Sequence, residues 1–580
     1  MNRLLLFALL ICLPLKGYMQ LTTPFKWAKM ISGKGYWGVS VTDAKTDDSG
    51  NVIICGQFSD SADFDPGPAV HILKADSGNI FLVKLDSSGK FKWARNFGNS
   101  GGVFLNVDHK GNIFCGGGAA EDADFDPGPA VVIVPRWASF ITKWEPDGTL
   151  SWVRDIRSLD LYPVGGIGAR EIHTDGSGNV YILGLYCGSI DVDPGPLVRV
   201  LNCGVCGSSG GTYLIKLDEN GTLVWAKNLT CPNAAWGGFA YDQHDRMQID
   251  SKDNIYYLET FTGSVDFDPG PADSILSTPP RVYETVLCKL DSSLNLKWVR
   301  RQCAMGALAI DKLDNVYLHS MFENSINLDP GKTGHTLYAP AGEKWNGLVM
   351  KVDSGGVFQW GKGISGLQDY QYFHRNVIFD SHGDLYLLTT LRDSAVLYDR
   401  TSRQLIAKIK KPGTSAALLR MDNAGKLKGG KIVLDTIAES SLRTCQLNID
   451  QKDNIVLTGS FKDTVDADPD AGTELLISKL YRSLFAIKLG PTIPLSLHAL
   501  AQAENCTVFP NPTQGPLTLM IDGFKDQAAI TVFDQQGKRI LSRTTNESLA
   551  ELDLSMYHAG LYLIQVSDAQ RETCIKVLKQ

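Results

Sequence analysis

The feature that most constrains this chain is a sequence unit that recurs between residues 25 and 489. Its first marker is an Asp, three intervening residues, and an Asn or Asp that opens a β-rich run. The marker occurs at 47–51, 108–112, 175–179, 250–254, 311–315, 380–384 and 450–454. A fixed period of this kind is typical of a chain that stacks copies of one supersecondary unit.

Two further markers accompany the first along the array. One is a basic, an apolar and an acidic residue that end a β run, as in Lys84-Leu85-Asp86. The other is a Trp with a basic residue two places later, as in Trp93 and Arg95. The seventh copies depart from the pattern, because Gly490 follows Lys488-Leu489 and Gly429 stands where a Trp is expected.

Each unit reads as four short strands, at 39–43, 52–58, 81–86 and 91–97 in the first copy, with no helical periodicity. Seven such units predict an all-β fold, a seven-bladed β-propeller. The array begins with a fourth strand alone at 25–29 and ends with a third strand at 485–489. We therefore expect the N-terminal strand to complete the last blade and close the ring, which leaves no exposed sheet edge.

The lengths of the connections point to one face of such a ring. The acidic residue of the second marker precedes the Trp position by 7 residues in six copies. By contrast, the Trp position precedes the next first marker by 13 to 25 residues, and the stretch between the second and third strands also varies. Both variable connections lie on the same face, and function concentrates on variable loops of rigid scaffolds. The longest loop supplies the candidate binding residues Trp236, Tyr241 and His244.

The most conspicuous motif is Asp63-Phe64-Asp65-Pro66-Gly67-Pro68, which recurs in four blades and weakens in others. Alternation places the apolar residue inward, Asp-Pro-Gly predicts a tight turn with a positive φ at Gly, and the Asp carboxylates accept turn N–H groups. The alternative is calcium, because paired carboxylates and turn carbonyls are hard oxygen ligands. No fixed third acid follows the pair, and the sixth blade lacks it. The calcium candidates are Asp63, Asp65, Asp124, Asp126, Asp191, Asp193, Asp266 and Asp268.

The two ends of the chain carry different signals. Residues 1–17 have one positive charge and a short apolar run, as in a secretory signal peptide, and no other long apolar run follows, so we expect no membrane span in the mature chain. Residues 490–505 read as a linker with two prolines. Residues 506–580 read as a small β-sandwich with Asn and Gly turns. Net charge is −7 without a basic cluster, which argues against nucleic acid as a partner.

Three resemblances follow from these residues. Asp-x-x-Gly-Asn-Val, Lys-Leu-Asp-x-x-Gly and Trp-Ala make residues 25–489 resemble the SBBP-type propeller repeats of Bacteroidetes exported proteins. The string from Leu85 to Trp93 resembles the tryptophan-docking motif of quinoprotein propellers, one residue shorter than usual. Residues 506–580 resemble the type A C-terminal sorting domain of the type IX secretion system. The sorting-motif residues are Pro510, Asn511, Pro512, Gly537, Gly560 and Tyr562.

These resemblances imply export through the Sec and type IX machineries to the cell surface or the medium. We expect a binding or interaction module that presents its variable loops to an unidentified glycan or protein. The alternative is an extracellular enzyme (a hydrolase, lyase or cofactor oxidoreductase) with its site at the channel mouth. The sequence shows no catalytic constellation of unlike residues and, calcium apart, no cofactor motif.

Overall fold

The computed structural model shows that this chain is built from β-strands. Every regular element in the described part is a strand, which confirms the all-β prediction. None of that part forms a helix long and apolar enough to cross a membrane. The described residues are 21, 23–36, 38–160, 167–203, 211–230, 246–279, 282–302, 306–330, 334–343, 345–367, 377–400, 402–408, 415–437, 442–470, 472–491, 506–521, 528–534, 538–567 and 572–579.

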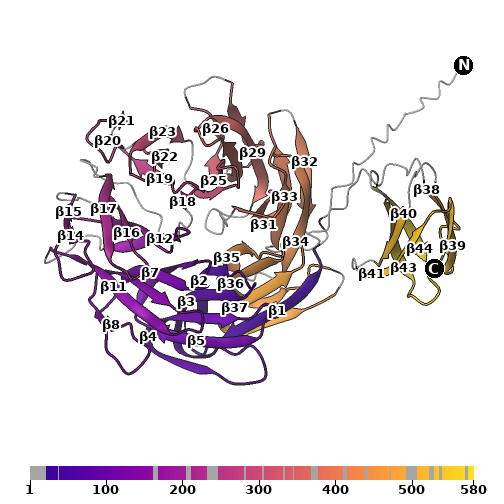
Figure 1. Cartoon of the computed structure of the whole chain (residues 1–580), viewed down its shortest axis with the longest axis horizontal. Helices are drawn as coiled ribbons and strands as arrows, with labels where there is room; N and C mark the ends of the chain where they lie inside the picture. Colours follow the sequence, from indigo (N-terminus) through magenta and orange to yellow (C-terminus); the bar gives the residue numbers. More distant parts are fainter. Residues whose placement is uncertain are drawn as a thin grey trace, which may run out of the picture.

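Strand pairing divides the repeat into seven antiparallel groups of four strands, called sheets 1 to 7, each ordered as in the chain (Figure 1). Sheets 5, 6 and 7 are joined by further pairing into one continuous sheet. Sheet 1 is β2 (Val39–Thr46), β3 (Val52–Asp63), β4 (Ile72–Leu85) and β5 (Phe91–Phe97). Sheet 2 is β6 (Ser100–Val107), β7 (Ile113–Ala119), β10 (Ser139–Trp144) and β11 (Leu150–Ser158). Sheet 3 is β12 (Gly168–Thr174), β13 (Val180–Tyr186), β16 (Gly211–Leu217) and β17 (Leu223–Thr230). Sheet 4 is β18 (Met247–Ile249), β19 (Ile255–Phe261), β22 (Glu284–Leu290) and β23 (Leu296–Gln302).

The last three sheets follow the same order, with one exception at the end. Sheet 5 is β24 (Gly306–Ile310), β25 (Val316–Glu323), β28 (Trp345–Val352) and β29 (Phe358–Leu367). Sheet 6 is β30 (Val377–Phe379), β31 (Leu385–Tyr398), β33 (Ser415–Met421) and β34 (Leu427–Ile437). Sheet 7 is β35 (Leu442–Ile449), β36 (Ile455–Asp466), β37 (Leu475–Leu489) and the N-terminal β1 (Phe25–Ser32).

The pairing of β1 with β37 joins the two ends of the repeat array. It is antiparallel and runs from Phe25 opposite Leu489 to Ser32 opposite Ser483. The predicted completion of the last unit by the N-terminal strand is therefore present. Without it, β37 would carry an unpaired row of backbone N–H and C=O groups.

Neighbouring side chains along a strand point to opposite faces of the sheet, and in these sheets both faces are buried. On β3, Ile53 packs in a core shared by sheets 1 and 2, whereas Ile54 packs in one shared by sheets 7 and 1. Seven apolar clusters of this kind each join two consecutive sheets. The cluster with Ile54 also contains Ile31, Leu484 and Val456, so it joins the last sheet to the first.

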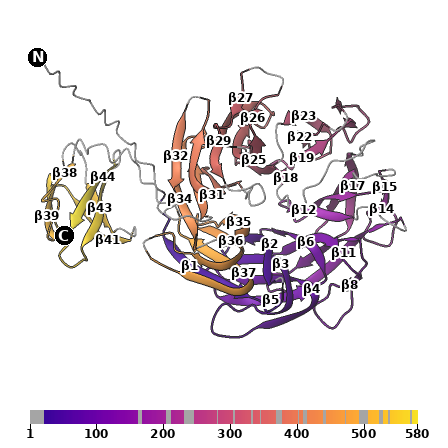
Figure 2. The ribbon, with the colours of Figure 1, turned by 180° about the vertical axis from the view of Figure 1, so that it is seen from behind.

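The second and third strands of each sheet continue into a two-stranded hairpin, several of which lie at the periphery in Figure 2. In the described part such a hairpin forms a ladder with the fourth strand of the preceding sheet at three places, as where Ile364 of β29 faces Leu397 of β31. At these places the backbone ladder passes from one sheet to the next. The separate hairpin strands are β8 (Ala123–Asp124), β9 (Ile133–Val134), β14 (Ser189–Asp191), β15 (Val200–Asn202), β20 (Ser264–Asp266), β21 (Ile275–Ser277), β26 (Ser325–Asn327), β27 (Thr336–Tyr338) and β32 (Arg403–Lys408).

The marker Trp of one sheet docks on the turn between the third and fourth strands of the next. The indole Nε1 of Trp93 donates to the carbonyl oxygen of Pro146 at 3.2 Å. A Cβ added at Gly148 would lie 2.7 Å from this ring, and Gly148 has a φ of +83°, so both the contact and the backbone require glycine. Equivalent bonds run from Trp27 to Ser87, Trp152 to Glu219, Trp298 to Ser354 and Trp360 to Asn423.

This docking explains why Gly429 of sheet 6 breaks the pattern. A Trp there would dock on the turn between the third and fourth strands of sheet 7. Those two strands are β37 and β1, which come from opposite ends of the repeat, so no turn joins them. The segment preceding β1 packs here instead. The N–H of Leu21 donates to the carbonyl oxygen of Gly430 at 3.2 Å, and Nζ of Lys431 donates to that of Thr23 at 3.1 Å. Leu21 is buried in the core between sheets 6 and 7.

The C-terminal unit has two antiparallel sheets around one apolar core. Leu519 and Leu552 enter this core from one sheet and Ile530 and Ile564 from the other. The first sheet is β38 (Cys506–Phe509), β39 (Pro516–Ile521) and β42 (Leu549–Asp553). The second is β41 (Arg539–Thr545), β40 (Ala528–Phe533), β43 (Gly560–Ser567) and β44 (Glu572–Lys579).

Candidate functional site

Each sheet has two ends of different character. At the variable end the second strand leads to the third and the fourth leads to the next sheet. At the constant end lie the short turns that carry the markers. The predicted binding residues Trp236, Tyr241 and His244 fall in the variable-end loop 231–245, outside the described residues. The structure therefore neither places these three residues nor brings them together.

The constant end carries a repeated ion pair between the Asp of the first marker and the basic residue of the second marker. Oδ2 of Asp47 accepts from the side chain of Asn51 at 2.8 Å and lies 2.9 Å from Nζ of Lys84. Burial opposes ionisation of Asp47, but hydrogen bonds from Asn51 and Lys84 outweigh it and hold its pKa below the ordinary value. The same pair recurs in five further sheets as Lys216–Asp175, Lys289–Asp250, Lys351–Asp311, Arg420–Asp380 and Lys488–Asp450.

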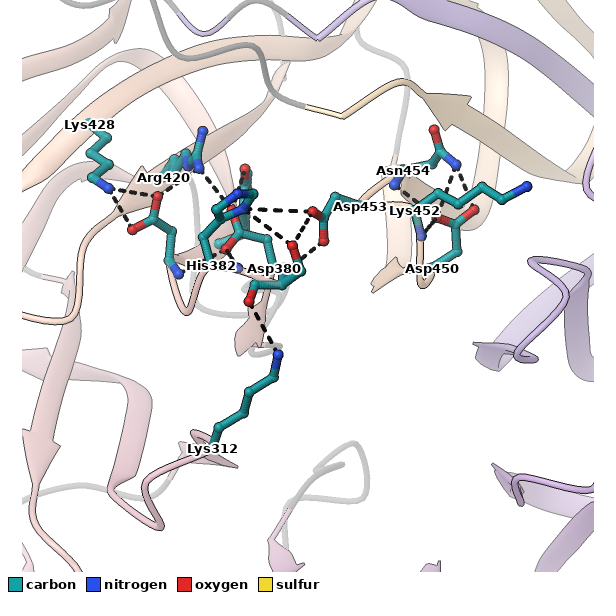
Figure 3. Close-up of polar contacts among 12 residues, drawn as sticks. Lys312, Asp380, His382, Arg420, Lys428, Asp450, Lys452, Asp453 and Asn454 are labelled. Carbon is teal, nitrogen blue, oxygen red and sulfur yellow. Dashed lines mark hydrogen bonds and ion pairs between the residues drawn. The ribbon is translucent and has the colours of Figure 1, made fainter. Parts of the chain in front are cut away.

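One group at the constant end has the composition of a catalytic triad without its geometry (Figure 3). Oγ of Ser381 donates directly to Oδ2 of Asp453 at 2.6 Å, while Nδ1 of His382 lies 3.3 Å from that hydroxyl. A triad instead needs the histidine between the hydroxyl and the carboxylate. Ser251 contacts Asp314 at the equivalent place between sheets 4 and 5 with no histidine, so this contact ties adjacent turns.

The Asp-x-Asp elements use one oxygen of each carboxylate to build the hairpin turn. Oδ1 of Asp63 accepts the N–H groups of Asp65 at 3.2 Å and His71 at 2.8 Å. Oδ1 of Asp65 accepts the N–H of Gly67 at 2.7 Å. The same bonds recur around Asp124 and Asp126, Asp191 and Asp193, and Asp266 and Asp268. The apolar residue at the middle position of this element is buried in all seven sheets, at Phe64, Phe125, Val192, Phe267, Leu328, Leu397 and Ala467, although sheets 5 and 6 lack the full pair of acids.

The prediction of a positive φ at the glycine of this turn is wrong. Gly67 does not have a positive φ, and neither do its equivalents Gly128, Gly195 and Gly270. The carboxylate closes the turn itself, in the manner of an Asx turn. Glycine is needed for close approach instead, because a Cβ at Gly67 would lie 2.9 Å from Oδ1 of Asp65.

Calcium at these elements stays a prediction. Oδ1 of Asp63 and of Asp65 is engaged with backbone N–H groups, so Oδ2 of each carboxylate would be the oxygen facing an ion. Within the described ranges, no group of three or more His, Cys, Asp or Glu side chains is positioned to hold a metal ion. Backbone carbonyls and water would have to complete the coordination shell.

A charged group lies between the inner strands of sheets 3 and 4 near the variable end, and sequence reasoning did not find it. Oε2 of Glu259 accepts from Oγ1 of Thr212 at 2.8 Å, and burial raises the pKa of Glu259 to about 7. Oε1 of Glu171 accepts the backbone N–H of Arg246 at 3.0 Å, and Oε2 lies 3.6 Å from Nε2 of His173.

Part of this group has a structural equivalent elsewhere in the repeat. Oδ2 of Asp43 accepts the N–H of Leu105 at 2.9 Å, which ties the first strand of sheet 1 to that of sheet 2. Glu171 and Asp43 both follow an irregular step in the first strand of their sheets. Glu171 therefore holds neighbouring sheets together.

Exposed aromatic side chains mark the variable end. Tyr36, Trp137, Tyr283 and Tyr338 are the strongly exposed aromatic residues of the seven sheets in the described part, and all four lie in variable-end connections. Tyr36 is 78% exposed, and its ring centroid lies 6.4 Å from that of Tyr481. Sequence reasoning selected this end from its loop lengths and placed its aromatic candidates in one loop, which lies outside the described residues. The sequence signal for these exposed residues was a Tyr or Trp that does not belong to the repeated markers.

In the C-terminal unit, the sorting-motif residues build the fold. Asn511 donates to the carbonyl oxygen of Lys576 at 2.6 Å and accepts the N–H of Leu578 at 2.9 Å, so it covers part of the edge of β44. Pro510 and Pro512 flank it, each after a cis peptide bond. The hydroxyl of Tyr562, two residues after Gly560, donates to the carbonyl oxygen of His558 at 2.6 Å. Gly537 lies outside the described residues.

Residues 507–580 match the family model of the secretion system C-terminal sorting domain. Export therefore follows the type IX route. The domain implies handling by the type IX secretion machinery and delivery of the chain to the cell surface or the medium.

Comparison with curated proteins finds no match. Among solved structures, the extracellular region of plexin A4 matches with 9% identity and a TM-score of 0.29, over 94% of this chain and 62% of that one. A rhamnogalacturonan lyase from Bacillus licheniformis matches with 12% identity and a TM-score of 0.29, over 82% of this chain and 76% of the lyase. The rhamnogalacturonan lyase YesW matches with 13% identity and a TM-score of 0.26, over 97% and 91%. TM-scores this low carry no functional argument.

Proposed function

We propose that this chain is an exported binding module whose seven sheets form a seven-bladed β-propeller, with residues 25–489 as the propeller, 490–505 as a linker and 506–580 as the sorting domain. The propeller is supported by the cyclic order of the seven inter-sheet cores and by the pairing of β1 with β37. The SBBP-type repeat is part of this proposal.

The variable end of the sheets is the proposed binding surface for a glycan or protein. One observation carries this assignment: the strongly exposed aromatic residues of the described sheets, Tyr36, Trp137, Tyr283 and Tyr338, lie in connections at that end. Tyr and Trp give large contact areas at low entropic cost, and they dominate binding energy at interfaces. The aromatic rings at the constant end instead dock between sheets.

The test is binding of the full exported chain to glycan and protein arrays, with and without EDTA. Tyr36→Ala and Tyr338→Ala remove exposed rings at the variable end, and Leu313→Ala removes an exposed apolar side chain at the constant end. We expect the two tyrosine variants to lose signal while the leucine variant binds as the parent does. Loss in the leucine variant alone would contradict the proposal.

An enzyme is the second candidate, and Glu259 is the observation that favours it. A buried carboxyl with a pKa of about 7 suits a general acid or base, and Arg246 and His173 lie in the same group. The exclusion of water around Glu259 also fits a plain structural role. Turnover of a polymer by the parent chain that Glu259→Gln abolishes, with binding unchanged, would favour the enzyme over the binding module.

A further inference from the structure

Trp137 occupies a backbone conformation that a tryptophan rarely adopts. Its φ is +68°, and the N–H of Ala138 donates to the carbonyl oxygen of Pro135 at 3.1 Å. Trp137 is thus the third residue of a four-residue turn, the place where a positive φ normally selects Gly or Asn. The turn is anchored to the end of β7, because the N–H of Trp137 donates to the carbonyl oxygen of Ala119 at 3.0 Å.

This unfavourable conformation displays the indole. Trp137 is 44% exposed although glycine would satisfy the turn. Strain of this kind is retained where the side chain serves a contact outside the fold. Because the turn fixes the backbone on both sides, the ring is held in place before any ligand arrives, and little conformational entropy would be lost on binding.

Arg136 places a charge over one face of this ring. Its guanidinium carbon lies 4.3 Å from the centroid of the Trp137 indole, and its backbone N–H is held by Oδ1 of Asp122 at 2.6 Å. A guanidinium presents a planar fork of donors that matches a carboxylate in bidentate geometry. The neighbouring Glu121 is engaged by the side-chain amide of Asn99 at 2.6 Å.

The exposed apolar residues beside this turn do not set it apart. Val131 and Ile133 are exposed on this hairpin, but so are Ile72, Leu197 and Ile275 on others. Exposed β-branched and leucine side chains therefore belong to the construction of the hairpins. The feature that this hairpin has in addition is the aromatic ring with its arginine.

Tyr481 and Arg482 lie near the equivalent place in sheet 7, before the part of β37 that pairs with β1. In strand register Tyr481 matches Arg136 and Arg482 matches Trp137, so the arrangement of Trp137 with Arg136 is not repeated there. Tyr36 lies beside Tyr481 across the junction of sheets 7 and 1. Exposed aromatic residues of the described part thus recur at the variable end of several sheets, which suits a ligand that is itself a repeating polymer.

We propose that Trp137 and Arg136 form a binding position for a carboxylated sugar of an acidic polysaccharide. The apolar C–H face of a pyranose ring stacks on the indole face opposite Arg136, and the sugar carboxylate accepts hydrogen bonds from the guanidinium past the edge of the ring. This inference rests on the proposed binding function and assigns its ligand class.

The experiment measures binding of the full exported chain to polygalacturonate, alginate and hyaluronan, in EDTA so that calcium bridges do not contribute. Fully methyl-esterified polygalacturonate is the matched neutral polymer. The variants are Trp137→Gly, Trp137→Ala, Arg136→Gln and Arg136→Lys, and Ile133→Thr is the control for an exposed residue of the same hairpin. Thermal unfolding of each variant reports whether the fold is retained.

We expect at least one uronate polymer to bind, and its methyl ester to bind about tenfold more weakly. Both tryptophan variants and Arg136→Gln should weaken binding about tenfold or more, with Arg136→Lys between them and the parent. Trp137→Gly should lose binding without losing thermal stability, which a purely structural role for the indole does not allow.

Three results would overturn this inference: no binding of any uronate polymer, equal binding of the methyl ester, or unchanged affinity in Trp137→Gly. Binding of a protein ligand that requires Trp137, with no uronate binding, would assign the surface to a protein partner instead. If Tyr36→Ala abolishes binding of a neutral polymer while Trp137→Gly is silent, the inference fails and the proposed function stands. If only Leu313→Ala at the constant end reduces binding, the proposed function fails as well.

Discussion

The indole of Trp27 donates a hydrogen bond to the backbone carbonyl oxygen of Ser87 at 3.2 Å, and this contact joins the last sheet to the first. Trp27 belongs to the N-terminal strand, which pairs with β37, whereas Ser87 lies in the turn after β4. The marker that docks several sheets on their successors therefore also acts across the junction of the two chain ends.

Trp27→Ala should destabilise this junction by about 2 kcal/mol, because it removes the ring and its hydrogen bond. Trp27→Phe keeps a ring and loses only the bond, at a cost of about 1 kcal/mol. Urea unfolding gives the free energies, and hydrogen exchange locates the effect. Backbone amides of β37 and β4 should exchange faster in Trp27→Ala, and unchanged exchange there would mean that the junction does not depend on this contact.

Leu21 should be essential although it precedes the first strand. Leu21→Asp places a carboxylate in the core between sheets 6 and 7 and should cost about 2–4 kcal/mol. Leu313→Asp is the matched control, because Leu313 is 73% exposed and should tolerate the charge. Urea midpoints of both variants measure the difference, and equal midpoints would contradict the docking of the N-terminal segment.

Glu259 makes part of the stability depend on pH. Its pKa is about 7 in the folded chain, above the value of about 4.3 for an exposed glutamate, so the folded state binds the proton more tightly. The stability that the protonated Glu259 contributes to the fold is fully present below about pH 4 and is lost as pH rises toward and through 7. Glu259→Gln removes this dependence. The variant should gain roughly 1–3 kcal/mol relative to the parent between pH 5 and pH 8, measured by urea unfolding at both values. A difference that does not change with pH would show that Glu259 is ionised throughout.

Asp65 should matter to the turn through its acceptor oxygen rather than its charge. Asp65→Asn keeps an acceptor for the N–H of Gly67 and should change stability by under about 0.5 kcal/mol. Asp65→Ala leaves that N–H without the side-chain partner and should cost about 1 kcal/mol. EDTA should leave the melting temperature of the parent unchanged. A melting temperature that EDTA lowers in the parent but not in Asp65→Asn would establish calcium at this element.

The turn at Trp137 should be more stable with glycine than with alanine. Both substitutions remove the indole, but only alanine keeps a Cβ at a φ of +68°. The free energy of unfolding of Trp137→Gly should therefore exceed that of Trp137→Ala by about 1 kcal/mol. Thermal and urea unfolding of the two variants provide the comparison. Equal stability would mean that the turn relaxes to another conformation once the ring is gone.

Much of the scaffold could be predicted from the sequence, because every repeat has the same local pattern and folds into the same four paired strands. Ile53 and Ile54 alternate in sequence and pack on opposite faces, as period two requires. The orphan fourth strand at the N-terminus indicated its partner, β37. The conformation of Gly67 was predicted wrongly, because the propensity of Asp-Pro-Gly does not say that the Asp side chain itself closes the turn.

The candidate sites could be predicted only as a region. The variation in loop length selects the variable end, and the exposed aromatic residues lie there. No spacing in the sequence brings Glu259 beside Thr212, because they lie on different strands and meet through pairing and packing. Likewise, nothing in the string Pro135-Arg136-Trp137 reports a positive φ, which depends on how the end of β7 holds this turn.

By itself, the sequence determined the number of units, their four strands and the pairing of the chain ends, because each follows from a repeated local pattern of apolar residues and turns. It also determined the secretion route, through residues 507–580. Only the tertiary structure decided what the exceptions mean. Gly429 replaces a Trp because the turn it would dock on is absent between β37 and β1, and Leu21 packs there instead. Contacts between residues at opposite ends of a chain leave no local trace, so their reason becomes visible only when the two ends meet.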